Sequence, residues 1–348
     1  MGESFRVRPL DPERDRPLLG RLWEAALGSV WPLLPDALDL VKEGLVAERG
    51  DGGTLRGSGP GEGDRAGRGL DRVAVDPVDL AGRGVGIVAV DPAGSIPLLV
   101  VDPAYQRRGV GTRLLDAGMA RLGQLGATTV ALGGGGNDYI WPGVPDNLPG
   151  AVGFFRARGW GFDHTVIDLV ADLRGYEAPA GVGERAGRAG VSIEVMAGPE
   201  RTEVMAFEAA AFPDWVGWFE RLDSSVLVAR DRAGAVAGTL LFRGPPGATI
   251  YEPLLGPGAG TIGCVGVAAP ARGAGVGSAM VARASELLRD AGTHACHIGW
   301  TRRERFYTRV GYTPWRRYHM ARRTARAEPP VRGSPGGRTP GTGWRQRW

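Results

Sequence analysis

Cysteine, lysine and long apolar runs are scarce in this sequence of 348 residues. The two cysteines are too few for the disulfide framework of a small secreted protein. Lysine occurs only at Lys42, so arginine carries nearly all of the positive charge. No apolar run could span a bilayer, and the first ten residues carry no signal-peptide core. We therefore expect a cytoplasmic protein with no membrane partner.

A basic face is also missing from the part of the chain that we expect to fold. The formal net charge is +4, yet residues 322–348 alone carry seven arginines and one glutamate. The rest is slightly acidic, which argues against a nucleic-acid partner. The Gly, Pro and Arg content predicts a disordered basic tail over residues 324–348. Because no His, Cys and Asp residues have metal-ligand spacing, we expect no metal site.

One glycine loop appears twice. The sequence QRRGVG at 106–111 follows an apolar strand and opens an amphipathic helix, and RGAGVG at 272–277 does the same. We call these loops the first and second cradle. Glycines let backbone N–H groups point at an anion, and the helix dipole favours negative charge there. The repetition predicts a duplicated domain that binds a phosphate-bearing ligand.

A second motif follows each cradle in the same order. It reads FFRARGW at 154–160 and FYTRVGY at 306–312. Each cradle helix closes on a glycine at the same offset, Gly126 or Gly292. Neither cradle ends in the Gly-Lys-Ser/Thr of a nucleotide triphosphatase, and residues 82–86 lack the third glycine of a dinucleotide fingerprint.

Strand and helix patterns alternate in both halves and predict the α/β class. We expect an N-terminal domain at 1–173, with a mobile insertion at about 50–69, and a C-terminal domain at 191–323. The Gly/Ala/Arg-rich stretch 174–190 between them is typical of a linker. The first half carries extra residues at 133–149, with aromatic side chains. They form either an ordinary surface loop or a contact with substrate or an interface.

The sequence VDPAYQRRGVG at 101–111, followed by the aromatic–glycine motif, resembles motifs A and B of the GNAT acyltransferases. The resemblance covers nearly all of the chain except the insertion at 50–69 and the tail. It implies two tandem GNAT folds, each a mostly antiparallel sheet with a splayed parallel strand pair and flanking helices. It also implies transfer of acetyl from acetyl-CoA to a primary amine by direct attack in a ternary complex.

In this family the strand before the cradle offers backbone groups to the pantetheine arm, and the cradle holds the pyrophosphate. The strand positions carried over are Leu99 and Val101 in the first half and Val265 and Val267 in the second. The implied cradle residues are Gln106, Arg107, Arg108, Gly109, Val110, Gly111 and Thr112, and Arg272, Gly273, Ala274, Gly275, Val276, Gly277 and Ser278.

A tyrosine in the second GNAT motif commonly protonates the departing thiolate. The matching residue is Tyr307 in the second half but Phe155 in the first, and phenylalanine has no proton to give. The resemblance therefore implies that the C-terminal domain is the catalyst. The N-terminal domain is then a structural or acyl-CoA-binding partner. The alternative for Tyr307 is a packing role in its helix.

No general base stands out, because the strands before the cradles carry no carboxylate. Glu252, Asp214 or a water chain remain open, and His297 is either a base or a hydrogen-bonded structural residue. The aromatic residues of 207–222 form either an acceptor wall or core. The resemblance implies an acceptor such as an amino sugar, an antibiotic or a similar metabolite. The missing carboxylate base supports the alternative of a non-catalytic acyl-CoA-binding regulator. A transferase that uses a longer acyl-CoA is a further alternative that the sequence leaves open.

Overall fold

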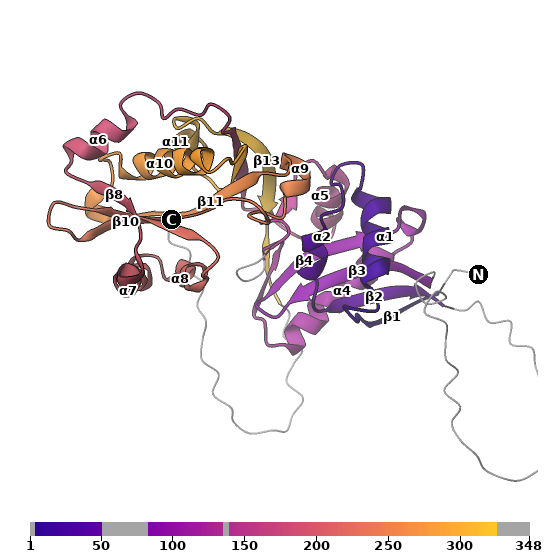
Figure 1. Cartoon of the computed structure of the whole chain (residues 1–348). Helices are drawn as coiled ribbons and strands as arrows, with labels where there is room; N and C mark the ends of the chain where they lie inside the picture. Colours follow the sequence, from indigo (N-terminus) through magenta and orange to yellow (C-terminus); the bar gives the residue numbers. More distant parts are fainter. Residues whose placement is uncertain (1–3, 51–82, 135–138, 326–348) are drawn as a thin grey trace, which may run out of the picture. The chain divides into compact units, whose positions relative to one another are not determined.

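The computed structural model describes residues 4–50, 83–134 and 139–325 (Figure 1). The predicted insertion at 50–69 and the predicted tail at 324–348 lie almost wholly outside these residues. Contacts divide the described chain into two compact units. Unit 1 holds residues 4–134 as far as described, with Thr324 and Ala325, and unit 2 holds residues 139–323.

Unit 1 contains a six-stranded sheet in the order β1-β2-β3-β4-β5-β14. Only β4 and β5 run parallel among its paired strands with assigned register. Leu18, Leu22 and Trp23 of α1, and Leu114 and Leu122 of α4, are buried and form its core. Its elements are β1 (Phe5–Pro9), α1 (Arg16–Leu27), α2 (Pro35–Asp39), β2 (Gly44–Arg49), β3 (Gly84–Asp91), β4 (Ser95–Val101), η1 (Pro103–Tyr105), α4 (Val110–Gln124), β5 (Thr129–Leu132) and the last residue of β14 (Arg322–Thr324), whose first two residues the contacts assign to unit 2.

Unit 2 contains an eight-stranded sheet in the order β6-β13-β7-β12-β11-β10-β9-β8, in which β11 and β12 are the parallel pair. Its elements are β6 (Val144–Pro145), α5 (Pro149–Arg156), β7 (His164–Asp172), α6 (Val182–Arg188), β8 (Ser192–Val195), η2 (Gly198–Glu200), α7 (Arg201–Ala211), η3 (Pro213–Trp215), α8 (Val216–Glu220), β9 (Ser225–Arg230), β10 (Val236–Arg243), α9 (Glu252–Leu255), β11 (Ala259–Val267), η4 (Ala269–Ala271), α10 (Val276–Asp290), β12 (Ala295–Thr301), α11 (Glu304–Thr308) and β13 (Thr313–Met320).

The two sheets exchange strands between the repeats. β7, the last strand of the first repeat, lies between β12 and β13 in the eight-stranded sheet, and β14 lies beside β5 in the six-stranded one. Leu169 and Ala171 of β7 are buried in the core of unit 2. The predicted domain boundary at residue 173 therefore does not coincide with the division between the units, which falls near residue 135.

The stretch at 174–190 is built into unit 2. It carries α6, and the ring of Tyr176 is buried in the core of unit 2. The Tyr176 hydroxyl donates to the Val310 carbonyl at 2.8 Å. Buried contacts of this kind hold the segment in place, although its glycine and arginine content is typical of a linker.

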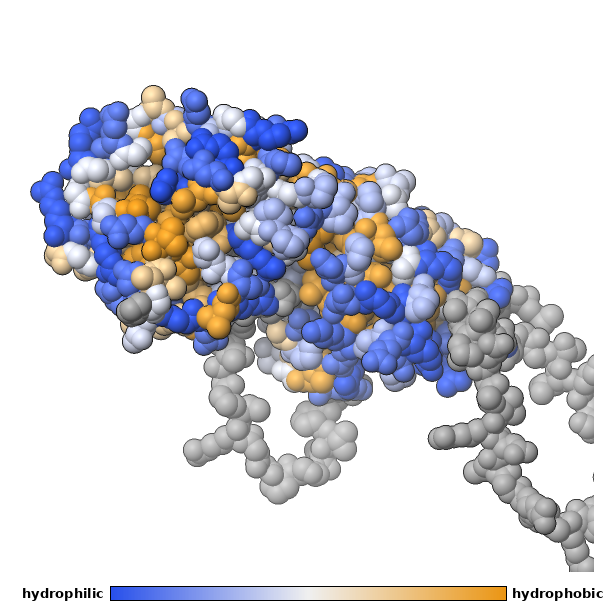
Figure 2. All heavy atoms as spheres, in the orientation of Figure 1, coloured by the Kyte–Doolittle hydropathy of each residue, from blue (hydrophilic) through white to orange (hydrophobic). Residues whose placement is uncertain are grey.

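Helices cover both faces of the sheet in unit 2. In Figure 1, α10 and α11 lie above β10 and β11, whereas α7 and α8 lie below. We call these the α10 face and the α7 face. Alternating side chains of the strands feed a separate hydrophobic cluster on each face. Figure 2 shows hydrophobic residues reaching the surface of unit 2 near β10, with hydrophilic residues around them.

Candidate active site

The second cradle is a tight loop between the end of β11 and the start of α10. Gly273 and Gly275 take positive φ angles of +83° and +85°, a conformation that favours glycine. The Arg272 Nε–H donates to the Val267 carbonyl at 3.0 Å, which ties the loop to the strand. No side chain caps α10. The geometry therefore presents the N–H groups of the first helical turn as an anion site.

The first cradle repeats this geometry at the end of β4. Gln106 takes the place of Arg272, and its Nε2 donates to the Val101 carbonyl at 3.0 Å. Arg107 and Gly109 have φ angles of +60° and +85°, so an arginine adopts the left-handed conformation that Gly273 adopts in the second cradle. α4 also begins without a side-chain cap. Both predicted cradles therefore have the backbone shape of an anion site.

The surroundings of the two cradles differ. A Cβ atom built on Gly109 would meet nothing within 4 Å among the described atoms. A Cβ atom on Gly275 would lie 2.9 Å from Cδ of Arg185. Arg185 belongs to α6, so the segment predicted as a linker brings a cation against the second cradle.

The parallel strands beside each cradle part before the loop begins. β11 and β12 pair only from Ala259–Thr261 to Ala295–His297, and β4 and β5 pair only at Ser95 and Ile96. In the described structure, the remaining lengths of β11 and β4 do not pair with β12 and β5, so their backbone groups on that side are left without a strand partner. The predicted pantetheine positions, Val265 and Val267 in one repeat and Leu99 and Val101 in the other, lie on these opened lengths.

A β-bulge lies in the opened length of β11. Its register with β10 pairs Gly266 with Thr239 and Gly263 with Leu241, so Cys264 and Val265 stand opposite Leu240 alone. Cys264 has a φ angle of +48°. β4 pairs with β3 without a shift from Leu98 to Val101. The bulge changes the direction of β11 where it separates from β12. It therefore distinguishes the second repeat from the first.

Tyr307 lies on the α10 face beside this opened strand. Its ring is 8% exposed, in one cluster with Val265, Val267 and Phe306. A Cβ on Gly277 would come within 3.1 Å of the Phe306 ring and 3.3 Å of Val267, so α11 is seated where β11 ends and α10 begins. Burial raises the pKa of the Tyr307 phenol and keeps it protonated. Within the described residues the hydroxyl has no hydrogen-bond partner.

A family model described as "Acetyltransferase (GNAT) family" matches residues 64–162 and 194–312, one match in each repeat. The chain belongs to the GNAT acetyltransferase family. The prediction of a tandem member with an acetyltransferase fold in each half is confirmed.

Individual relatives point the same way. A mycothiol acetyltransferase of Clavibacter sepedonicus is 30% identical over 217 residues, which cover 58% of this chain and 62% of that protein. A fungal multi-domain β-N-acetylglucosaminidase contains a GCN5-related glucosamine N-acetyltransferase region. It is 28% identical, with a TM-score of 0.76 over 92% of this chain and 38% of that one. A tandem GNAT protein from the clavulanic acid biosynthesis pathway is 17% identical, with a TM-score of 0.57 over 92% of this chain and 99% of that one, and shares the fold.

The first GNAT repeat lacks the arrangement found around Tyr307. Phe155, the matching residue, packs edge-on against Trp160 with ring centroids 6.1 Å apart. It lies on α5 in unit 2, whereas the first cradle lies in unit 1. Cradle, bulged strand and tyrosine therefore occur in one compact unit only for the second GNAT repeat.

Glu208 is a titratable group that the sequence reasoning missed. It lies on α7 and is fully buried, and one carboxylate oxygen accepts the Thr239 hydroxyl. The other oxygen, Oε2, has no partner in the described structure. Burial raises the pKa of Glu208 to about 7. Its spacing from Val204, one helical turn earlier on the same buried stripe, was a sequence signal for this position.

The three residues named in the sequence analysis as possible bases lie in surroundings that differ from those of Glu208. The two carboxylate oxygens of Glu252 accept the backbone N–H groups of Gly247 and Gly258 at 2.9 and 3.3 Å. Asp214 is exposed on η3. His297 is buried, with Nε2 3.2 Å from a carboxylate oxygen of Asp168. This geometry favours structural roles for Glu252 and His297.

The extra residues of the first repeat pack into unit 2. The rings of Tyr139 and Trp300 meet edge to face with centroids 4.9 Å apart, and the Ile140 carbonyl accepts the Tyr251 hydroxyl at 2.5 Å. Ile140 and Trp141 are buried. Residues 139–149 are therefore not an ordinary surface loop. They contact β12 beyond the point where β12 leaves β11.

The aromatic residues after α7 were expected to form either an acceptor wall or core, and they differ in this respect. Phe219 is 1% exposed and belongs to the core of the α7 face. Phe212 and Trp215 stack with centroids 4.8 Å apart and are half-buried. A Cβ on Gly266 would collide with the Phe212 ring, so the Phe212 ring lies against β11 just after the bulge.

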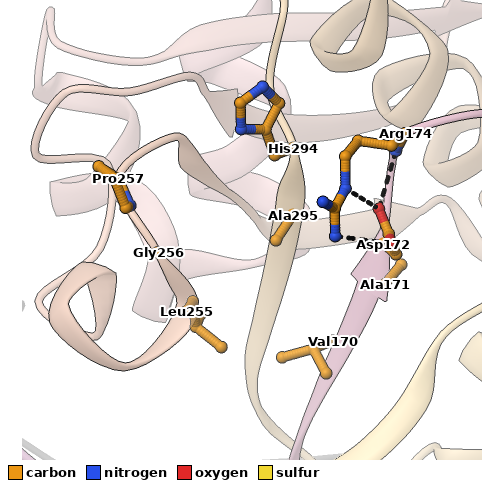
Figure 3. Close-up of a pocket in the computed structure, with 9 residues that line it drawn as sticks. All are labelled: Val170, Ala171, Asp172, Arg174, Leu255, Gly256, Pro257, His294 and Ala295. Carbon is orange, nitrogen blue, oxygen red and sulfur yellow. Dashed lines mark hydrogen bonds and ion pairs between the residues drawn. The ribbon is translucent and has the colours of Figure 1, made fainter.

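A hollow of about 430 Å³ lies elsewhere in unit 2. Figure 3 shows His294 and Ala295 at the start of β12, with Asp172 and Arg174 paired at the end of β7. β11 and β12 are parallel, and their opened lengths and the second cradle lie at the opposite, carboxyl ends of these strands. The hollow is therefore separate from the candidate active site.

Among residues 4–50, 83–134 and 139–325, no group of three or more His, Cys, Asp or Glu side chains is placed to hold a metal ion. No helix in these ranges has both the length and the apolar character needed to cross a membrane.

Proposed function

We propose that this chain transfers an acetyl group from acetyl-CoA to a primary amine of a small molecule, and that the second repeat carries the reaction. The observation that supports this most directly is that Tyr307 belongs to the hydrophobic cluster against which Val265 and Val267 pack, next to the second cradle. In the described structure Phe155 and the first cradle belong to different units.

The donor would bind along the opened strand. The N–H groups at the start of α10 take the pyrophosphate, as at other helix N-termini with glycine loops. The backbone of Val265 and Val267 takes the amide groups of the pantetheine arm. This arrangement directs the thioester toward the opening between β11 and β12, where Tyr307 lies.

The amine nitrogen attacks the thioester carbonyl in a ternary complex. A C–N bond forms and the C–S bond breaks, and the departing thiolate takes the proton of the Tyr307 hydroxyl. A buried phenol is suited to this step because it stays protonated until a strong base forms beside it.

We infer that the acceptor amine belongs to a sugar-bearing small molecule. One relative is named a mycothiol acetyltransferase, and a similar solved structure contains a glucosamine N-acetyltransferase region. The half-buried rings of Phe212 and Trp215, beside the opened strand, offer apolar faces of the kind against which sugars stack. A cytoplasmic location and the absence of a nucleic-acid partner remain predictions.

A non-catalytic acyl-CoA-binding regulator is the second candidate. The observation that favours it is the lack of a carboxylate on β11 from Thr261 to Val265. A longer acyl-CoA as donor is a further variant of the transferase.

A thiol-release assay separates these possibilities. Acetyl-CoA and longer acyl-CoAs are tested with glucosamine, other amino sugars and amino-acid amines. We expect release that depends on both acetyl-CoA and an amino sugar. Tight CoA binding by calorimetry with no amine-dependent release would instead favour the regulator, and release only with a longer acyl chain would change the donor.

A further inference from the structure

Two sets of contacts place Glu208 beside the bulge of β11. Its hydrogen-bond partner Thr239 stands opposite Gly266 in the β10–β11 register. Phe212, one turn further along from Glu208, donates its backbone N–H to the Glu208 carbonyl, and its ring covers Gly266. Both sets of contacts lead to the part of β11 that has separated from β12.

Side chains at the bulge divide between the two faces of the sheet. Val265 and Val267 pack on the α10 face with Tyr307. Cys264 packs on the α7 face, in the cluster that contains Val204 of α7. Glu208 lies one turn from Val204 on the same buried stripe. A hydroxyl therefore stands on one face of the opened strand and a carboxylate on the other.

We propose that Glu208 is the catalytic base of the second repeat and takes the proton of the attacking amine on the α7 face. This inference rests on the proposed function. The free Oε2 is the acceptor atom, and the Thr239 hydroxyl fixes the orientation of the carboxylate by donating to its other oxygen.

Protons and bonds balance across the two faces. As the C–N bond forms, the amine proton passes to Oε2 of Glu208, and as the C–S bond breaks, the Tyr307 proton passes to the thiolate. The products are the amide and CoA thiol. Transfer of a proton from Glu208 to the Tyr307 phenolate, through solvent, restores the enzyme.

The charge environment suits a base that works near neutral pH. Burial raises the pKa of Glu208 to about 7. From β11 the titratable group that faces it is the Cys264 thiol, whose pKa is also raised by burial, and β10 contributes only the Thr239 hydroxyl. The nearby charges of α7 and β9, Glu203 and Arg230, pair with each other. In the described structure no cation pairs with Glu208, so nothing pulls its pKa back down.

The test compares Glu208→Gln with the wild type, with acetyl-CoA as donor and glucosamine first among the acceptor amines. The variant keeps the shape of the side chain. We expect kcat/KM to fall by about 10²–10⁴-fold, with little change in the KM for acetyl-CoA. Glu203→Gln, on the exposed side of the same helix, is the matched control and should keep its rate.

The pH profile distinguishes a base from a structural residue. The acceptor amine also titrates, so the useful quantity is the wild-type rate divided by the Glu208→Gln rate at each pH. We expect this ratio to rise with pH through about 7 and then level off. A constant ratio near one would overturn the assignment while leaving the transferase function intact. No amine-dependent turnover by the wild type would instead overturn the proposed function.

A second variant covers the case in which Glu208→Gln does not fold. Thr239→Val removes the hydrogen bond that stabilises the charged carboxylate, so the pKa of Glu208 should rise further. The ascending limb of kcat/KM should then move to higher pH. An unmoved limb in folded Thr239→Val would also overturn the assignment.

Discussion

One hydroxyl group separates Tyr307 from its counterpart Phe155. Replacing Tyr307 with Phe copies the residue of the first repeat and preserves the ring that packs against Phe306. We predict that kcat falls by about 10²–10⁴-fold while the KM for acetyl-CoA changes little, because the lost group acts on the leaving thiolate. Steady-state kinetics by thiol release measures both constants.

Tyr312→Phe is the matched control for this change. Tyr312 is buried in the same cluster, and its hydroxyl bonds to Ser285 at 2.7 Å. Its loss should lower stability by about 1 kcal/mol and leave kcat nearly unchanged. Full turnover by Tyr307→Phe, together with loss of turnover in folded Phe155→Ala, would move the active site to the first repeat.

The raised pKa of Glu208 predicts how stability depends on pH. The carboxyl has a pKa of about 7 in the folded chain, against an ordinary value of 4.5 when it is solvated. The folded state therefore binds this proton more tightly than the unfolded state between these values, and stability falls as pH rises through that window. The full effect is about 3 kcal/mol, because one pKa unit corresponds to about 1.4 kcal/mol.

Chemical denaturation at pH 5 and pH 8 measures this effect. We expect the wild type to lose more unfolding free energy between the two pH values than Glu208→Gln, which cannot ionise. Equal losses in the two proteins would show that the carboxyl does not titrate in this window. Comparing the two proteins cancels the other titrating groups.

The residues that could be predicted are those whose role depends on neighbours close in the sequence. The cradles were visible because glycine spacing, strand and helix start are contiguous in sequence, and their φ angles follow from that pattern. Glu208 was missed because its meaning depends on Thr239 and Gly266, which only the tertiary fold brings close. From the sequence alone, Glu252 was an equally good carboxylate candidate. In the structure, backbone N–H groups of the surrounding turn donate to both of its carboxylate oxygens.

At the scale of elements, α6 shows how composition can conceal structure. Its Gly, Ala and Arg content matches a linker, but Ala186 is buried and Arg185 lies against the second cradle. A helix this short has too few apolar residues to show a helical period in the sequence. Its position depends on contacts with α10, which lies roughly a hundred residues later in the sequence.

Arg185→Ala tests whether this helix contributes to donor binding. The aliphatic part of the Arg185 side chain lies against Gly275 of the second cradle, and Arg185 has no ion-pair partner in the described structure. We predict that CoA binds about fivefold more weakly at low salt, because an exposed pair contributes up to about 1 kcal/mol. Calorimetry at two salt concentrations measures the change, which should shrink as salt screens the charge.

Arg188→Ala on the same helix is the control, because Arg188 is exposed and lies 3.9 Å from Glu184. It should leave CoA affinity unchanged. Tighter CoA binding by Arg185→Ala would mean that Arg185 covers the cradle in the free protein and must move aside for the ligand.

At the scale of the whole molecule, the duplicated cradles predict two CoA sites per chain. Gly109 and Gly275 have the same φ angle, so a bulky acidic residue at either position is strained and repels phosphate. We expect titration to saturate at about two CoA per chain in the wild type. Gly109→Glu and Gly275→Glu should each remove one site.

Of these two variants, only Gly275→Glu, which removes the CoA site of the second cradle, should abolish turnover. Saturation at one CoA in the wild type would show that one cradle is closed to the ligand. If Gly109→Glu rather than Gly275→Glu removed that single site, the catalytic assignment to the second repeat would be wrong.

The exchange of last strands between the repeats could not be predicted from the sequence. The mostly apolar sequence of β7 fits a place in either sheet, because a strand carries the same two-residue side-chain period whichever partner it meets. The order of elements within each repeat is likewise unchanged by the exchange. Only the register of β7 with β12 and β13 shows which sheet holds it.

This exchange predicts where the chain can be divided. A fragment of residues 174–325 lacks β7 and so leaves β12 and β13 with unpaired edges and the places of Leu169 and Ala171 empty. We expect it to aggregate or to melt without a cooperative transition, whereas residues 139–325 should melt cooperatively by circular dichroism. Adding a peptide of residues 160–173 should restore a transition to the shorter fragment. Equal, cooperative melting of both fragments would mean that unit 2 folds without the strand of the first repeat.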